Sequence, residues 1–444
     1  MTNQNSKIIE KNNPVGIPRA GAVILDILYV ILSVFYLPTF LFNGKHRPGI
    51  VERCGIYPHD VLRFLANSRQ VIWLHAVSVG EIRAAVPLIE ALREKYPEAQ
   101  LLISTITPTG NAVARQIAVE GELVIYFPFD LSPIVRKAIS IIRPKMILIM
   151  ETELWPNFIT EAFRQDIPIA IINGRISDNA FLRYKKAGWF FRPILKNIDL
   201  FCMQTPTDAK RIEAIGARKN NIRVTGNLKF DQIIQPGEEN TLDLGLTKNQ
   251  RLIVAGSTHD QEEQIITQVF IKLKAKYPDI RLLIAPRHPH RAKAVEQVIK
   301  DCGLTAFCLS QIKQQETAPG NQEVLILDTM GMLNNIYALA DIVFIGGSLV
   351  PHGGHNPIEP AVCGKPVVFG KHMFNFAEIA GIFLSNQAAV SVKDEQELYD
   401  TLHSLLKDAD KRRDLARRAQ KVISDNRGSV KRVMDIITEQ FKID

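Results

Sequence analysis

A glycine-rich stretch at residues 341–360, DIVFIGGSLVPHGGHNPIEP, carries the first pattern with chemical potential. An apolar run at 342–345 precedes two pairs of glycines. Asn356 and Pro357 then form a helix start, because Asn is a good N-cap and proline at the first helical position loses no useful N–H. A buried strand, a permissive turn and a helix N-terminus together predict an anion site. We predict that this turn holds the phosphate of a nucleotide-activated donor, with Glu359 accepting hydrogen bonds from a ribose. The alternative is a glycine-rich connection found in any α/β protein.

Three carboxylates in the first half of the chain have positions suited to proton transfer or acceptor binding. Glu81, in HAVSVGE, stands at an expected helix start, where the dipole favours its charged form, and a charged carboxylate can take a proton from an attacking hydroxyl. The alternative is a carboxylate that only stabilises the helix start. Glu151 and Glu153, in METELWP, would share one face of an extended chain and could orient an acceptor sugar. Their alternative is pairing with a nearby arginine.

Polar side chains also follow two expected strands in the second half of the chain. Ser257 and Thr258 end one apolar run, and Arg287 and His288 follow the next. Hydroxyls and fixed cations at strand ends suit phosphate or carboxylate groups, and Arg287 could grip a carboxylate through two parallel bonds, as a lysine could not. Asn375 would complete a polar rim. The alternative is a set of solvated loop residues.

Several common catalytic motifs are missing from the sequence. It contains no Walker A motif, no HExxH, no GxSxG and no intact GxGxxG. The five cysteines are scattered, without CxxC or zinc-type spacing, which favours a reduced compartment and argues against a structural metal. We therefore expect no metal site and no cofactor.

Short apolar runs separated by helical stretches must position these residues. The pattern predicts parallel sheets covered on both faces, with ligands beyond the carboxyl ends of the strands. Ser78, Thr107 and Arg175 fall at such ends and join the first-half carboxylates as candidate acceptor contacts. The runs are residues 71–76, 101–105, 123–127, 146–150, 167–173, 251–257, 280–286, 323–328, 341–347 and 366–370.

A chain of 444 residues is too long for one ordinary core and predicts two domains. The pattern lapses around residues 226–248, and the charged helical tail from Asp394 could pack back on the first half, which the pattern leaves open. A formal net charge of +8 suits phosphates, nucleic acid or an anionic membrane. The expected divisions are a polar tail (1–19), an anchor (20–44), an N-terminal domain (45–230), a linker (231–250) and a C-terminal domain (251–444).

The stretch from Ala20 to Phe42 is apolar and about as long as a bilayer core of roughly 30 Å requires. No small-residue cleavage site follows, so we expect an anchor rather than a removed signal peptide. Asp26 and Pro38 weaken a spanning helix, and basic residues flank both ends, so orientation stays open. A helix lying in the interface and a buried core helix are the alternatives.

The motifs, taken in order, resemble those of a known family. They are HAVSVGE, TPTG, METELWP, NGRIS, TGNLKFD, STHDQEE, PRHPHR, DTMGML, FIGGSLVPHGGHNPIEPA and FNF. The chain is similar over most of its length to the 3-deoxy-D-manno-octulosonic acid (Kdo) transferases of lipopolysaccharide synthesis. The resemblance implies a GT-B fold, two Rossmann-like domains facing a cleft. It also implies metal-independent, inverting transfer of Kdo from CMP-Kdo to lipid IVA, the lipid A precursor.

The resemblance also assigns roles to single residues. The Glu of the SVGE motif, the family's base, falls on Glu81. The family's N-terminal half takes the acceptor, and the strand-end residues Ser78, Thr107, Glu151, Glu153 and Arg175 are its expected contacts here. The family's donor motifs fall on Arg287, His288, Gly346, Gly347, Ser348, Gly354, Asn356 and Glu359, and the strand-end residues Ser257 and Thr258 and the rim residue Asn375 complete the expected donor contacts.

The expected partners are therefore CMP-Kdo, lipid IVA and a membrane, with no nucleic acid. The expected location is the inner membrane, with the catalytic domains on the cytoplasmic side. Two alternatives stay open. One is another GT-B enzyme that uses a UDP-sugar, and the other is a non-catalytic nucleotide- or RNA-binding module that uses the basic surface.

Overall fold

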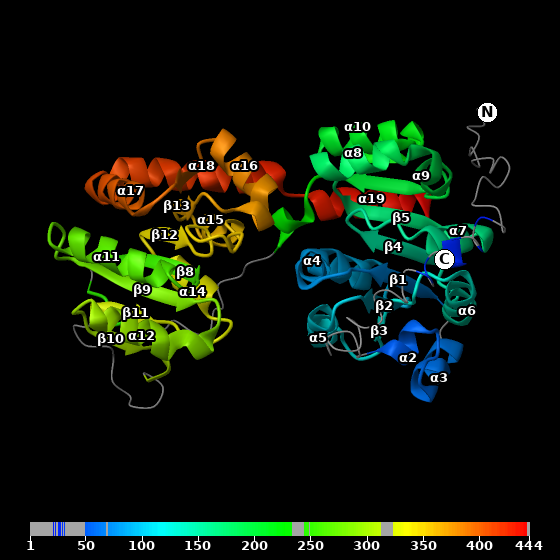
Figure 1. The fold of residues 1–444 in the computed structure, drawn as a ribbon, viewed down its shortest axis with the longest axis horizontal. Helices are drawn as coiled ribbons and strands as arrows, with labels where there is room; N and C mark the ends of the chain where they lie inside the picture. The colour runs from blue at the N-terminus through cyan, green and yellow to red at the C-terminus, as the bar shows by residue number, and fades with distance from the viewer. Residues whose placement is uncertain are drawn as a thin grey trace, which may run out of the picture. The chain divides into compact units, whose positions relative to one another are not determined.

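The chain forms two compact units, each built on one parallel sheet (Figure 1). Unit 1 holds the residues up to 232 together with those from 427 onward, and unit 2 holds residues 233–426. The prediction of two parallel, Rossmann-like α/β domains is confirmed. The computed structural model describes residues 21, 23, 25–27, 29, 31, 49–67, 70–232, 244–247, 249–311 and 323–441.

Unit 1 has a seven-stranded sheet in the order β3-β2-β1-β4-β5-β6-β7. The strand order turns back between β1 and β4, and ligands of open α/β sheets bind beyond the carboxyl ends of the strands at such a point. The strands are β1 (Val71–His75), β2 (Gln100–Thr105), β3 (Leu123–Tyr126), β4 (Met146–Met150), β5 (Ile169–Gly174), β6 (Leu200–Met203) and β7 (Ile222–Val224). The helices are α2 (Ile50–Arg53), α3 (His59–Asn67), α4 (Val79–Lys95), α5 (Pro108–Ile117), α6 (Ser132–Ile142), α7 (Pro156–Arg164), α8 (Asp178–Lys186), α9 (Gly188–Leu195), α10 (Pro206–Ile215) and α19 (Ser429–Gln440).

Unit 2 repeats this plan in the order β10-β11-β9-β8-β12-β13-β14, with its turning point between β8 and β12. The strands are β8 (Arg251–Thr258), β9 (Ile280–Pro286), β10 (Ala306–Cys308), β11 (Val324–Ile326), β12 (Ile342–Ile345), β13 (Val367–Gly370) and β14 (Ala389–Val392). The helices are α11 (Glu262–Lys274), α12 (Ala292–Asp301), α14 (Leu333–Leu339), α15 (Ile358–Val362), α16 (Ala377–Ser385), α17 (Glu395–Lys407) and α18 (Ala409–Asn426).

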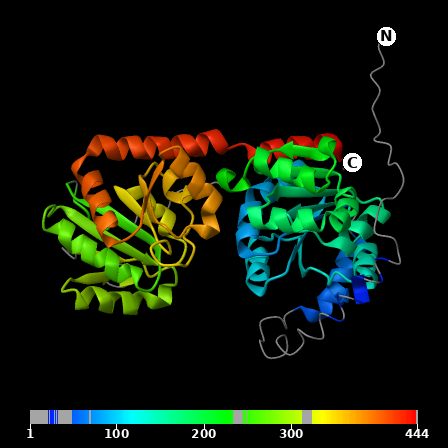
Figure 2. The same ribbon diagram turned by 45° about the horizontal axis from the view of Figure 1, so that its top comes forward.

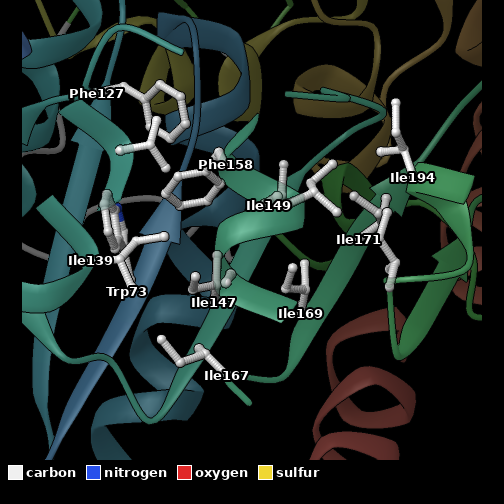
Figure 3. Packing of buried hydrophobic residues seen from close by; sticks show 14 of the residues in the cluster. Trp73, Phe127, Ile139, Ile147, Ile149, Phe158, Ile167, Ile169, Ile171 and Ile194 are labelled. Carbon is white, nitrogen blue, oxygen red and sulfur yellow. The ribbon is translucent and has the colours of Figure 1, made fainter. Parts of the chain in front are cut away.

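The strands of unit 1 are apolar on both faces because helices cover both. Trp73 of β1 faces the cluster formed with α6, α7 and α9, whereas its neighbours Ile72 and Leu74 face the cluster formed with α4, α5 and α19. Figure 3 shows the first cluster, in which the rings of Trp73 and Phe158 meet edge to face with their centroids 5.0 Å apart.

The last helix, α19, belongs to unit 1 rather than to the C-terminal domain expected at residues 251–444 (Figure 2). Its apolar side chains Val433 and Ile437 are four residues apart and complete the cluster over α4. The Asp231 carboxylate accepts hydrogen bonds from the N–H groups of Gly428 and Val430, each at 2.6 Å, and so holds the start of the helix.

The predicted anchor at residues 20–44 lies mostly outside the described residues. Where the structure does describe the chain, no helix is both long and apolar enough to cross a bilayer. Within the described positions, the Asp26 carboxylate accepts hydrogen bonds from Ser132 N–H at 2.9 Å and from the Asn157 amide at 3.0 Å. Asp26, which weakened the prediction of a spanning helix, is therefore bonded to the starts of α6 and α7.

Candidate active site

Glu81 lies in the first turn of α4, directly beyond the carboxyl end of β1. Ser78 is the N-cap of this helix. One Glu81 carboxylate oxygen accepts a hydrogen bond from Val77 N–H at 2.8 Å, and the other accepts one from the Ser78 hydroxyl at 3.0 Å. The SVGE sequence therefore forms a capping-box-like arrangement, with the glutamate reaching back past the start of its own helix. These bonds fix the carboxylate, whose residue is only 8% exposed.

Burial decides the protonation of this carboxyl. Removal from water raises the pKa of Glu81 from 4.5 to about 7, and the charges of Glu151 and Glu153 also raise it, against the lowering effect of the bonds from Val77 and Ser78. Burial and the Glu151 charge raise the pKa of Glu153 as well. Three carboxyl groups thus lie at one edge of the sheet. Repulsion between their negative charges favours the protonated form of Glu81 and Glu153.

The loops after β4 and β5 are tied together at this edge. Glu151 has a left-handed backbone with φ of 56°, and its N–H donates to Ile172 O at 2.8 Å. The Thr152 hydroxyl donates to Arg175 O at 2.6 Å and accepts from Arg175 N–H at 3.0 Å. A non-glycine residue held in the left-handed region is often found at functional sites, where the surroundings enforce the strain.

The predicted acceptor residues of unit 1 therefore gather at one place. Thr107 caps α5, and its hydroxyl lies 3.3 Å from Val77 O, next to the Glu81 loop. Ser78 bonds Glu81 directly. Strands β1, β2, β4 and β5 bring these groups to the same edge, because the carboxyl ends of parallel strands coincide.

In unit 2, backbone N–H groups of the glycine-rich turn after β12 bind a carboxylate of the protein itself, that of Glu262. The Glu262 carboxylate, fully buried in the first turn of α11, accepts hydrogen bonds from the N–H groups of Gly347 at 2.5 Å, Ser348 at 2.9 Å and Leu349 at 2.8 Å. His259 N–H adds a fourth bond at 3.2 Å. The predicted phosphate contact through these turn amides is therefore corrected: the amides of Gly347 and Ser348 are occupied.

Other groups of this turn also form hydrogen bonds or close contacts within unit 2. The buried Ser348 hydroxyl donates to Ile345 O at 2.5 Å and accepts from Gly370 N–H at 2.6 Å. A Cβ at Gly346 would lie 2.4 Å from Ser257 O, so glycine is needed for β12 to approach the end of β8. Thr258 is also fully buried, and its hydroxyl donates to Glu263 at 3.0 Å. These contacts hold the turn after β12 in place.

Histidines lie beside this turn, and three of them were not among the predicted site residues. The Nε2 atoms of His259 and His355 lie 3.0 Å apart, so one ring donates to the other, and the His352 ring stacks on His259 with the centroids 4.2 Å apart. Burial and neighbouring cations, Arg287 among them, lower the pKa of His259 to about 4 and that of His355 to about 3. Both rings are neutral at pH 7. Their only sequence signal was their presence in STHDQEE and VPHGGHNP.

Arg287 supplies the fixed charge beside these rings. Its backbone N–H donates to Thr258 O at 2.9 Å, which places it beyond the end of β9, and it is partly exposed. Within the described parts of the chain, its guanidinium forms none of the ion pairs, unlike Arg291, which binds Glu263 at 2.7 Å. A partly exposed guanidinium whose charge reaches the His259 and His355 rings suits a phosphate or carboxylate. His288 is exposed next to it.

The helix start before α15 is one residue later than predicted, since α15 begins at Ile358 and its N-cap is Pro357 rather than Asn356. The Asn356 side chain still bonds the first turn: it accepts from Ile358 N–H at 3.1 Å and donates to Glu359 at 3.2 Å. Gly354 has φ of 70°, and its N–H donates to Gly347 O at 2.8 Å. The Asn375 amide donates to His352 O at 3.0 Å. Asn375 thus positions the histidine loop.

No group of three His, Cys, Asp or Glu side chains suited to a metal ion occurs among the residues that the structure describes.

Comparison with known proteins adds sequence evidence to this geometry. Residues 49–232 match the family described as 3-deoxy-D-manno-octulosonic-acid transferase (kdotransferase), and residues 245–422 match the family described as glycosyl transferases group 1. A 3-deoxy-D-manno-octulosonic acid transferase of Haemophilus influenzae is 34% identical over 89% of this chain and 92% of its own length. One of the same description from Chlamydia pneumoniae is 29% identical over 88% of this chain and 90% of its own.

A solved structure shares the architecture at much lower identity. UDP-GlcNAc 2-epimerase from Neisseria meningitidis, bound to UDP-GlcNAc, has a TM-score of 0.59 and 14% identity, covering 84% of this chain and all of its own (100%). At that identity the likeness concerns the fold alone.

Proposed function

The chain belongs to the 3-deoxy-D-manno-octulosonic acid (Kdo) transferase family, and from this premise we propose that it transfers Kdo from CMP-Kdo to lipid IVA. It is a glycosyltransferase by family. The donor and the lipid acceptor are the proposed part, together with a location at the cytoplasmic face of the inner membrane. The observation that carries the proposal is Glu81, a buried carboxylate at the turning point of the first sheet with a pKa near neutrality.

Glu81 would act as the general base. A base works best when its pKa lies near the working pH, because it is then both ionised and basic enough to take a proton. The bonds from Val77 and Ser78 hold its two oxygens in place, so the carboxylate needs no reorganisation before it accepts the proton of the sugar hydroxyl. Glu151 and Glu153 keep its basicity high through their charges.

Arg287 and the surrounding imidazoles would hold the anionic donor. CMP-Kdo carries a phosphodiester and a carboxylate, and a guanidinium binds either through two parallel bonds. The leaving group is a phosphate, so a fixed cation and N–H donors can stabilise its charge without a separate general acid. The attack would take place on the face opposite the leaving group, as in inverting glycosidases, where one carboxylate activates the incoming hydroxyl.

The decisive test is mass analysis of the lipid after incubation of the protein with CMP-Kdo and lipid IVA. We expect the acceptor to gain the mass of Kdo, and Glu81→Gln to abolish this gain while CMP binding stays within about twofold, because Glu81 touches the acceptor side only. Competition by CMP but not by UDP would support the cytidylate donor. Transfer from a UDP-sugar, or full activity of Glu81→Gln, would refute the proposal.

A further inference from the structure

A cavity of about 230 Å³ lies at the carboxyl ends of β2 and β3, on the same edge of the first sheet as Glu81. Its walls are mainly aromatic, and they include a guanidinium. The lining contains Arg53, Ile106, Phe127, Phe129, Asp130 and Trp155. None of the predicted acceptor residues belongs to this lining, so the cavity is a surface that the site described above does not use. We call it the Arg53 cavity.

The short helix α2 holds Arg53 at this cavity. Gly49, with φ of 74°, lets the helix begin directly against the Tyr126 ring, which a Cβ at this position would overlap. The Glu52 carboxylate accepts from Tyr126 N–H at 2.9 Å. The Arg53 carbonyl accepts from Phe129 N–H at 2.8 Å. These bonds join α2 to the end of β3 and so give the Arg53 side chain a defined position.

The Arg53 guanidinium is buried without a counter-ion. The residue is 9% exposed, and within the described parts of the chain its guanidinium forms none of the ion pairs. Nη2 donates to Ile106 O, whereas Nε is buried without an acceptor. Burial lowers the pKa of Arg53, although the charge of Glu52 opposes this. Because a buried charge without a partner costs free energy, the cavity favours an anionic guest.

The aromatic walls add a second requirement. Phe127 stacks on His75 of β1 with the centroids 3.9 Å apart, and its centroid lies 5.4 Å from that of Trp155. The Arg53 guanidinium lies over the Phe129 ring, with Cζ 6.0 Å from the ring centroid. Trp155 Nε1 is another buried N–H that has no acceptor among the described residues. The guest therefore needs an apolar face as well as an anionic group.

The carboxyl group of the lining, that of Asp130, forms hydrogen bonds within unit 1. Its two oxygens accept from Asn157 N–H at 3.1 Å and from Phe158 N–H at 2.8 Å. Burial raises the pKa of Asp130 to about 7 against the lowering effect of these bonds, and the Asp26 charge also raises it. The carboxyl is therefore partly protonated at neutral pH, which reduces its repulsion of an anion.

A single guest has to match both features of the cavity. An acyl chain would cover the aromatic walls but leave the guanidinium without an anion. Inorganic phosphate would pair with the guanidinium but leave the aromatic walls in water. A sugar ring that carries a phosphate does both, because its C–H face can pack on aromatic rings while its phosphate accepts charge-assisted bonds from an arginine.

We propose that the Arg53 cavity binds a phosphorylated sugar ring, with the phosphate on the Arg53 guanidinium. This inference rests on the proposed function, since lipid IVA is a phosphorylated glucosamine disaccharide and the cavity would receive one of its phosphorylated sugars. The backbone links the cavity to the base. Ile106 N–H donates to Val77 O at 3.4 Å, and Val77 N–H donates to Glu81 at 2.8 Å. A sugar held here would fix where the acceptor lies relative to Glu81.

Trp155 provides a direct measure of binding. The full chain carrying Trp189→Phe, which removes the exposed indole, is titrated with N-acetylglucosamine 1-phosphate, with CMP present to occupy the proposed donor site. Trp73 is fully buried, so a change in emission reports Trp155. We expect a saturable change, binding of neutral N-acetylglucosamine at least about tenfold weaker, and a loss of about 30-fold for the phosphorylated sugar in Arg53→Met.

Transfer assays separate phosphate recognition from a merely structural role, because Arg53 also bonds Ile106 O. With lipid IVA, Arg53→Met should raise the KM for the acceptor about 30-fold and leave the KM for CMP-Kdo unchanged. With enzymatically dephosphorylated lipid, the variant should differ little from the wild type. Arg53→Lys should recover part of the loss, since lysine keeps the charge. The matched control is Arg63→Met, which removes an exposed cation from α3 and should change nothing.

The outcomes separate this proposal from the enzymatic one, because Glu81→Gln should bind the sugar phosphate like the wild type although it transfers no sugar. The cavity proposal is overturned if the neutral sugar or inorganic phosphate binds as tightly as the sugar phosphate. It is also overturned if Arg53→Met impairs transfer equally with both lipids, which would leave Arg53 a structural role only. Weaker binding of the free sugar phosphate with normal transfer to lipid IVA would overturn the role in acceptor recognition.

Discussion

Replacing Glu81 with glutamine should stabilise unit 1 while it inactivates the enzyme. A buried carboxyl whose pKa is raised from 4.5 to about 7 opposes folding whenever it is ionised. Its favourable contribution is complete below the unfolded-state pKa and is lost as the pH rises through the folded-state pKa. Glutamine keeps one oxygen for Val77 N–H and an amide for the Ser78 hydroxyl, so the local bonds can be preserved.

The size of the effect follows from the two pKa values. The interval from 4.5 to about 7 corresponds to about 3 kcal/mol, at about 1.4 kcal/mol per pH unit. At pH 5 the carboxyl of the folded protein is still protonated and the difference between variant and wild type should be about 1 kcal/mol. At pH 8.5 it should reach about 3 kcal/mol, so the advantage of Glu81→Gln should grow by about 2.5 kcal/mol between these pH values.

Tryptophan fluorescence can measure this in unit 1 alone, because Trp73, Trp155 and Trp189 all belong to that unit. Urea unfolding at pH 5 and pH 8.5 gives the free energy of unfolding for each protein. Glu90→Gln is the matched control, since Glu90 is an exposed glutamate of the same helix, and it should leave the pH dependence unchanged. An equal pH dependence in the wild type and Glu81→Gln would show that the Glu81 carboxyl is not held in a desolvating site, and the assignment of the base would fail.

Three further outcomes follow from the contacts described. Arg287→Ala should weaken CMP binding about 30-fold, and Arg287→Lys should recover only part of this, because an ammonium cannot form two parallel bonds; calorimetry measures both. Glu262→Ala should destabilise unit 2 by about 3 kcal/mol, since the buried N–H groups of Gly347, Ser348 and Leu349 lose their acceptor; faster hydrogen exchange at Gly347 would report it, and unchanged exchange would contradict it. Glu151→Gln should move the acidic limb of the kcat/KM profile of transfer to lower pH, because the Glu151 charge raises the pKa of Glu81; an unmoved limb would mean the two carboxyls are not coupled.

The strands with long apolar runs were predictable, whereas the two short edge strands β7 and β10 were not. Runs such as 71–76 and 341–347 became β1 and β12, since a strand buried on both faces requires continuous apolar sequence. Strands β7 and β10 have three residues each and lie at the edges of their sheets, where partial exposure removes the need for such a run. Their short segments carry too little pattern to be distinguished from loops.

The position of Glu81 could be foreseen, and the role of Glu262 could not. The helix start at SVGE is local, because the bonds of Glu81 reach only three and four residues along the chain. The bond from Glu262 to Gly347 joins residues 85 positions apart, and only the pairing of β8 with β12 brings them together. The sequence of a glycine-rich turn does not distinguish a turn whose N–H groups bind a ligand's phosphate from one whose N–H groups bind a side chain of the same protein.

The return of α19 to unit 1 means that the chain passes from one unit to the other twice, after residue 232 and again after residue 426. A fragment that ends at residue 232 would lack α19 with its side chains Val433 and Ile437. The apolar side of α4 that they cover would then be exposed to water. Separate study of the two units therefore requires different fragments. Unit 2 can be produced as one continuous segment, whereas unit 1 needs its last helix, α19, rejoined to residue 232 by a short linker.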